Sequence, residues 1–177
     1  MSLPKLHPLK TKLPEMDGQL PRIIVDTREQ TPLVFTRLAS EVAGLTTGDY
    51  SYSGGEQVFG VERKSIGDLV GCCTGLDRAR FERELLRLRS FRFKRLLVVG
   101  RQEDIEAGNY RSRIAPGSVI GTLAMIEHRF EVPVVFCDTP EDGALLVEAW
   151  ACWSAREIVT AANHLARRMS DPVAENF

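Results

Sequence analysis

Three charged side chains in the first half of the chain have the types and spacing needed for phosphoryl chemistry. Asp49 is followed by Glu62 and, two positions later, by Lys64. The intervening Gly54-Gly55 pair predicts a hairpin with a two-residue loop, which would place Asp49 opposite Gly60. Since side chains alternate along a strand, Asp49, Glu62 and Lys64 would share one face, and Gly60 would leave open space between the carboxylates.

Two carboxylates beside an open space suit a hard divalent cation such as Mg²⁺, which keeps some of its waters for substrate phosphates. Such an ion polarises a phosphoryl oxygen and provides hydroxide at neutral pH. The ammonium of Lys64 would stabilise the charge that builds on phosphorus. Asp26, at the end of the preceding predicted strand, could add a further carboxylate. The same charges could also be the solvated side of a hairpin, and spacing alone leaves both interpretations open.

Strands and helices alternate in the sequence around these residues. Short buried strands are expected at 22–26, 95–100 and 132–136. Helices are expected at 37–44, 65–73, 78–90, 102–107, 117–129 and about 139–168, the last possibly with a break. Ser65 and Asp68 form a capping-box pattern. This order predicts an α/β fold with a mixed central sheet and helices on both faces.

The length of 177 residues favours one domain. We expect a flexible arm at 1–20, the domain at 21–168 and a short tail at 169–177. No apolar run reaches about 18 residues and no secretory signal is recognisable, which predicts an intracellular protein without a membrane span, in the cytoplasm, nucleoid or nucleus. The four cysteines contain no C-x-x-C pair and the three histidines are scattered, which predicts buried thiols and no structural zinc site.

The net charge of −1 gives no overall sign of a polyanion partner. Residues 77–95, however, contain eight basic and three acidic side chains. Such a local excess suits a nucleic acid backbone. A solvated helix face with ion pairs, such as Arg80 with Glu84, would produce the same pattern.

The motifs IIVDTREQ (23–30), GDYSYS (48–53) and VERKSIGDL (61–69) occur in this order. The aspartate followed by Glu62-x-Lys64 resembles the PD-(D/E)xK nuclease signature. Together the three motifs resemble the nuclease domain of the XPF family of structure-specific DNA endonucleases, over roughly residues 20–165. The resemblance implies a restriction-endonuclease-like fold and DNA cleavage that depends on Mg²⁺ (or Mn²⁺).

Carried over motif by motif, the resemblance implies that Asp49 and Glu62 are the main metal ligands. Lys64 matches the catalytic lysine, and Asp26 matches a supporting acid near the metal. The family pattern thus assigns the same roles to these residues as their chemistry suggests.

Four further motif residues have two open interpretations each. Arg28 and Glu29 would line the site or form structural ion pairs. Arg63 should point away from the face of Lys64 and would contact a phosphate or brace the hairpin. Asp68 would assist the site or only cap the helix that begins after Ser65.

The resemblance implies a DNA partner, branched or at a junction of single and double strands. No helix-hairpin-helix pattern follows residue 136, so this specificity does not carry over from the motifs. A homodimer is a further expectation, with Trp150 and Trp153 as candidate contacts. A catalytically silent DNA-binding or scaffold subunit, or a phosphohydrolase for small substrates, are the rival hypotheses. The arginines expected to contact DNA are Arg78, Arg80, Arg83, Arg87, Arg111 and Arg113.

Overall fold

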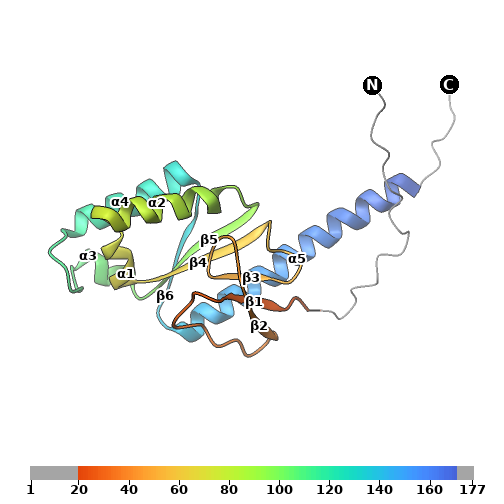
Figure 1. Cartoon of the computed structure of the whole chain (residues 1–177), viewed down its shortest axis with the longest axis horizontal. Helices are drawn as coiled ribbons and strands as arrows, with labels where there is room; N and C mark the ends of the chain where they lie inside the picture. The colour runs from red at the N-terminus through yellow and green to blue at the C-terminus, as the bar shows by residue number, and fades with distance from the viewer. Residues whose placement is uncertain (1–19, 171–177) are drawn as a thin grey trace, which may run out of the picture.

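The computed structural model describes residues 20–170, and a six-stranded mixed sheet forms its centre (Figure 1). The strand order is β2-β1-β3-β4-β5-β6. The strands are β1 (Ile23–Asp26), β2 (Ser40–Ala43), β3 (Tyr50–Tyr52), β4 (Phe59–Ser65), β5 (Phe93–Val99) and β6 (Val134–Cys137). The predicted N-terminal arm and C-terminal tail lie almost entirely outside the described residues. No helix among residues 20–170 has the length and apolar character to cross a membrane.

Five helices cover the two faces of the sheet (Figure 1). Four of them pack on one face and the long helix α5 on the other, as the predicted α/β architecture requires. The helices are α1 (Ile66–Gly71), α2 (Gly75–Arg89), α3 (Gln102–Glu106), α4 (Pro116–Phe130) and α5 (Pro140–Ser170). The capping box of Ser65 and Asp68 is formed at the start of α1.

Strand β4 is the point where the two halves of the sheet meet. It pairs antiparallel with β3 and parallel with β5, from Phe59 opposite Phe93 to Ser65 opposite Val99. Its apolar residues are buried on both sides, and its last residues emerge at the carboxyl end of the sheet. In open α/β sheets this end is where ligand sites form.

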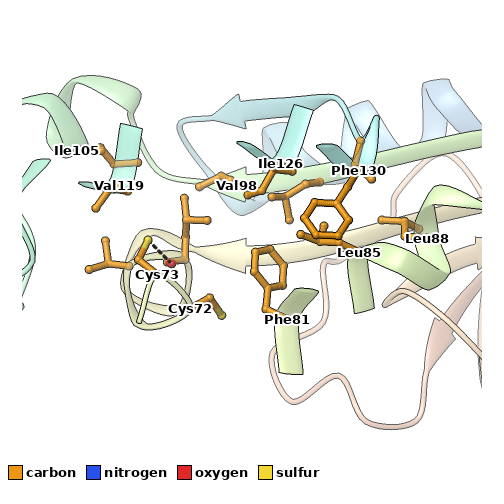
Figure 2. Packing of buried hydrophobic residues seen from close by; sticks show 14 of the residues in the cluster. Cys72, Cys73, Phe81, Leu85, Leu88, Val98, Ile105, Val119, Ile126 and Phe130 are labelled. Atoms are coloured by element: carbon orange, nitrogen blue, oxygen red, sulfur yellow. Dashed lines mark hydrogen bonds between the residues drawn. The ribbon is translucent and has the colours of Figure 1, made fainter. Parts of the chain in front are cut away.

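Two hydrophobic cores hold the helices to the sheet. On the α2 side, Phe81, Leu85 and Leu88 form an apolar stripe that packs against Ile126 and Phe130 of α4 (Figure 2). On the α5 side, a second cluster combines Ala144, Val147 and Ala151 with side chains of β3 and β4. Each aromatic or aliphatic side chain buried in these clusters stabilises the fold by roughly 1.5–3 kcal/mol.

Segment 37–44 is not a helix, contrary to the prediction. Residues Ser40–Ala43 form the edge strand β2, which runs parallel to β1 with Val25 opposite Val42. A helix of this length would gain little beyond its costly first turn, whereas residues 40–43 gain main-chain hydrogen bonds by pairing with β1. The last predicted helix also differs, because α5 continues to Ser170 without a break.

The β3–β4 hairpin has a wider connection than the two-residue loop that was predicted. Residues 53–58 form it, with Val58 and Phe59 donating to the carbonyl of Gly55. Gly55 packs so closely on the ring of Tyr52 that a Cβ atom there would lie 2.3 Å from a ring carbon. The turn therefore folds back on Tyr52 and does not close directly between Gly54 and Gly55.

One buried carboxylate fastens α5 to the segment that precedes β2. Oε1 of Glu148 accepts main-chain hydrogen bonds from Thr36 (3.1 Å), Arg37 (2.8 Å) and Leu38 (3.0 Å), and Glu148 is only 3% exposed. Three N–H groups thus depend on a single side-chain oxygen.

We predict that Glu148→Ala lowers the free energy of unfolding by about 3 kcal/mol, because it leaves three N–H groups without their acceptor. Urea denaturation monitored by circular dichroism would measure the loss. The exposed Glu157→Ala on the same helix is the control and should change stability by less than about 0.5 kcal/mol. Equal stability of the two variants would contradict this account of Glu148.

Candidate active site

The open end of the β3–β4 hairpin brings Asp49 beside Glu62. The N–H of Asp49 donates to the carbonyl of Val61 (2.8 Å), and Oδ2 of Asp49 accepts from the N–H of Arg63 (2.7 Å). The register pairs Tyr50 with Val61, and the hydrogen bond from Asp49 puts Asp49 next to Val61 as well. It differs by two residues from the predicted register, and a shift of two leaves every side chain on its predicted face.

The role proposed for Gly60 from the sequence was wrong. A Cβ atom on Gly60 would lie 2.9 Å from Cδ1 of Leu88 and 3.0 Å from Cδ2 of Phe91. Its missing side chain therefore makes room for helix α2, and the predicted register had put it in the wrong place. The space beside the carboxylates lies further along β4.

Lys64 lies between two acids and over an aromatic ring. Its Nζ atom is 2.5 Å from Oε1 of Glu62, 3.9 Å from Oε2 of Glu84 and 5.5 Å from the ring centre of Phe81. Burial alone would lower the pKa of Lys64, but Glu62, Asp49 and Glu84 together raise it above its usual value. Lys64 is therefore a charged donor at neutral pH.

Asp49 and Glu62 form a pair of like charges in a poorly solvated place. Burial, followed by repulsion from Glu62, raises the pKa of Asp49 to about 7, although the N–H of Arg63 and the charge of Lys64 oppose the shift. Burial likewise raises the pKa of Glu62, against the attraction of Lys64. The free site thus holds more negative charge than its surroundings stabilise.

The donor set fits a divalent cation that keeps part of its water shell. Asp49 and Glu62 offer hard carboxylate oxygens whose repulsion such a cation would relieve. Within residues 20–170, no group of three acids, histidines or cysteines is arranged as a complete metal cage. Asp49 and Glu62 would hold such an ion with two carboxylates, and its other positions would be left to water and substrate oxygens.

Asp26 lies behind this pair, in contact with the neighbouring loops. Oδ1 accepts from the N–H (2.9 Å) and Nε (2.6 Å) of Arg28, and Oδ2 accepts from the N–H of Leu45 (2.6 Å). Burial would raise the pKa of Asp26, but these hydrogen bonds outweigh it and lower the pKa. Arg28 also donates to the carbonyl of Leu45 (2.8 Å), so Asp26 and Arg28 together hold two loops at the ends of β1 and β2.

A cavity of about 550 Å³ opens over the carboxylate pair. Loops 28–31 and 46–48 form one wall, and helices α1 and α2 form the other, with Asp49 and residues 62–64 between them. Arg28, Arg80 and Arg87 bring positive charge to a space that also contains the acids.

Arg63 turns to the face of the sheet opposite Lys64 and reaches the first of these loops. It donates to the carbonyl (3.1 Å) and hydroxyl (3.2 Å) of Thr31 and lies 3.8 Å from Oε1 of Glu29. Of its donors, Nε is buried and makes no hydrogen bond within the described part of the chain. Through these contacts Arg63 links β4 to Glu29 and Thr31 in the cavity wall.

Asp68 lines the cavity and also caps α1. Its Oδ2 accepts from the hydroxyl (2.7 Å) and N–H (3.3 Å) of Ser65, and its own N–H donates to the Ser65 hydroxyl (3.1 Å). The capping interpretation of Asp68 is confirmed, and its assistance to the site stays a prediction.

The arginines expected to contact DNA lie in three kinds of place: at the cavity, elsewhere on α2, and between α3 and α4. Arg80 and Arg87 line the cavity, and Arg83 is exposed on the same helix. Arg78 is half-buried and donates to Glu82 (3.0 Å) and to the carbonyl of Cys73 (3.2 Å). The segment between α3 and α4 carries exposed Arg111 and Arg113, which do not line the cavity.

Glu84 and Phe81 are site neighbours that sequence reasoning missed. Their spacing of three on a helix indicated a shared side of α2, and Glu84 was seen only as a partner of Arg80. The contact with Lys64 depends on how α2 crosses β4, which local spacing does not reveal.

The fold and motifs together define the class of protein. The ERCC4 domain family model matches residues 25–149, and the chain belongs to the ERCC4 domain family. This confirms the family resemblance, which is to an XPF-type nuclease domain. A search of curated protein sequences finds no match.

Solved structures confirm the predicted fold class. The chain is similar to XPF from Aeropyrum pernix, with a TM-score of 0.60 and 22% identity over 80% of this chain and 69% of that one. It is equally similar to XPF from Aeropyrum pernix in complex with DNA, with a TM-score of 0.60 and 22% identity over 77% of this chain and 66% of that one.

The raised pKa of Asp49 makes the stability of the metal-free protein depend on pH. Folding favours the protonated acid, so the stabilisation is complete below the unfolded value of 3.8 and is lost as pH rises through about 7. We predict that Asp49→Asn removes this loss and is more stable than wild type at pH 8 by about 2 kcal/mol.

Urea denaturation in chelator at pH 5 and pH 8 would measure this difference. Asn keeps an oxygen that can accept from the N–H of Arg63, so the hairpin contact survives. The exposed Asp138→Asn is the control and should keep the pH dependence of wild type. An Asp49→Asn protein with that same dependence would show that Asp49 is not the group responsible.

Proposed function

We propose that this chain is a divalent-metal-dependent endonuclease that hydrolyses phosphodiester bonds of DNA. The observation that supports this most is the buried pair Asp49 and Glu62 with charged Lys64 beside it, in a cavity edged by arginines. Acids that repel one another cost stability, which is the sign of a site built for a charged ligand.

In this proposal Asp49 and Glu62 hold Mg²⁺ (or Mn²⁺), and Asp26 supports them by fixing Arg28 and the loops. The bound ion supplies Lewis-acid activation of the phosphate and lowers the pKa of water. Lys64 stabilises the negative charge that develops on the phosphate oxygens. Water would attack phosphorus in line with the bond to the 3′ oxygen; that bond breaks, the 3′ oxygen takes up a proton from solvent, and the product keeps a 5′-phosphate. Arg28, Glu29, Arg63 and Asp68 keep the cavity walls in place around the reacting group.

DNA would enter along α2, where Arg80, Arg83 and Arg87 follow one side of the helix. These side chains contact backbone phosphates, which position the duplex without reading its sequence. Arg111 and Arg113 extend the positive surface next to α4. Arg78, which bonds Glu82 and the carbonyl of Cys73, supports the helix rather than the DNA.

We propose that the substrate is branched DNA or DNA at a junction of single and double strands. The protein would act on it in DNA repair or recombination, within an intracellular compartment. Residues 21–168 act as one nuclease domain. A homodimer would use α5, where Trp153 is 60% exposed and Trp150 lies under Arg95 at 5.7 Å.

Cleavage of branched DNA in Mg²⁺ tests the activity itself. Lys64→Ala and Glu62→Gln should each lower the rate by at least about a hundredfold, since each removes a group that acts on the reacting phosphate. DNA affinity measured by fluorescence anisotropy should persist in both variants. The exposed Glu106→Gln on α3 is the control and should cleave like wild type. Wild-type protein that binds DNA but never cuts it in Mg²⁺ or Mn²⁺ would identify a silent binding subunit instead.

Salt dependence tests the path of the DNA. Arg87→Ala should weaken binding and reduce the slope of log affinity against log salt concentration by about 1, as expected for loss of one phosphate contact. Arg101→Ala, at the start of α3 where Arg101 pairs with Asp138 and does not line the cavity, is the control. If Arg101→Ala weakens binding as much as Arg87→Ala does, DNA does not lie along α2.

A further inference from the structure

Helix α2 supplies a second acid to the lysine at the centre of the site. Glu84 Oε2 lies 3.9 Å from Nζ of Lys64, and Phe81, one turn earlier, presents its ring to the same ammonium. Among residues 20–170, Glu62 and Glu84 are the acids that form ion pairs with Lys64. The lysine is therefore held from two sides, by its own strand and by the helix.

The two acids differ in what else they must do. Glu62 is a proposed ligand of the cation, so its oxygens are shared between Lys64 and the metal. Glu84 also lines the cavity, but its other contact is Arg80 at 3.9 Å, one turn back on α2. Glu84 is thus the acidic partner of Lys64 that is not also a proposed ligand of the metal.

A lysine side chain has a flexible four-carbon stem, and its catalytic use depends on where its ammonium is held. We infer that Glu84 is a positioning residue that, with the ring of Phe81, holds the ammonium of Lys64 over the reacting phosphate. This inference rests on the proposed nuclease function, and it assigns to α2 a part in the chemical step as well as in DNA contact.

The same helix offers a matched control. Glu82 is 24% exposed at its side chain, close to the 27% of Glu84, and also has two basic partners, Arg78 and Arg129. It does not line the cavity. Glu82→Gln therefore removes the same charge from the same helix with similar burial, but away from Lys64.

Single-turnover cleavage and DNA affinity should separate under Glu84→Gln. We expect the rate at saturating DNA and Mg²⁺ to fall about tenfold, because Lys64 loses one of its two acidic partners. Affinity should stay equal or increase, because a negative charge beside Arg80 and Arg87 is removed. Glu84→Asp, which keeps a shorter carboxylate, should recover part of the rate, and Glu82→Gln should cleave like wild type.

Nuclear magnetic resonance of lysine ¹³Cε atoms gives a readout that needs neither metal nor cleavage. The chain has five lysines, and Lys64→Arg assigns the signal of interest. In the metal-free protein, Glu84→Gln should shift the Lys64 signal and leave that of Lys94 in place, while Glu82→Gln should leave both in place.

The outcomes distinguish this inference from the proposed function. If wild type does not cleave DNA, the proposed function fails, and an unmoved Lys64 signal would separately overturn the contact. If wild type cleaves and folded Glu84→Gln cleaves at the same rate, the nuclease assignment stands and the positioning role of Glu84 is wrong. Thermal melting of each variant confirms that the comparison is between folded proteins, and Glu84→Asp carries the test if Glu84→Gln does not fold.

Discussion

The repulsion between Asp49 and Glu62 is the constraint on which the rest of the site depends. Two acids are brought together by the register of β3 and β4 and are screened poorly from one another. Lys64 offsets part of this repulsion, and the remainder is available to a cation. The surrounding structure keeps the pair from separating, since Oδ2 of Asp49 is held by the N–H of Arg63. The repulsion between the two acids lowers the stability of the free protein, and binding of a cation would restore that stability.

The walls of the cavity are fixed by contacts that leave the chemistry to β4. Asp26 and Arg28 join two loops on one side, and Arg63 joins β4 to Thr31. Glu148 anchors the same long segment from the opposite face of the sheet. The loop between β1 and β2 is consequently tied both at the site and at α5, which explains how an irregular segment can serve as a wall.

Much of this arrangement could be predicted from the sequence, for physical reasons that differ by element. Buried strands and the stripe of Phe81 and Leu85 follow from periodicity, and the helix start at Ser65 follows from local capping chemistry. The shared face of Asp49, Glu62 and Lys64 survived a wrong register because the error was an even number of residues.

What could not be predicted depended on contacts between distant segments. Segment 40–43 became a strand because β1 was available as a partner, which no local propensity records. The sequence analysis placed Gly60 beside the metal because the crossing of α2 over β4 was unknown, and Glu84 was overlooked for the same reason.

The open end of the hairpin, away from the wide connection at 53–58, keeps β3 and β4 in register. The main-chain bond from Asp49 to Val61 aligns the strands at the open end whatever side chain stands at position 49, so a substitution there can change the chemistry while the register of the hairpin stays in place.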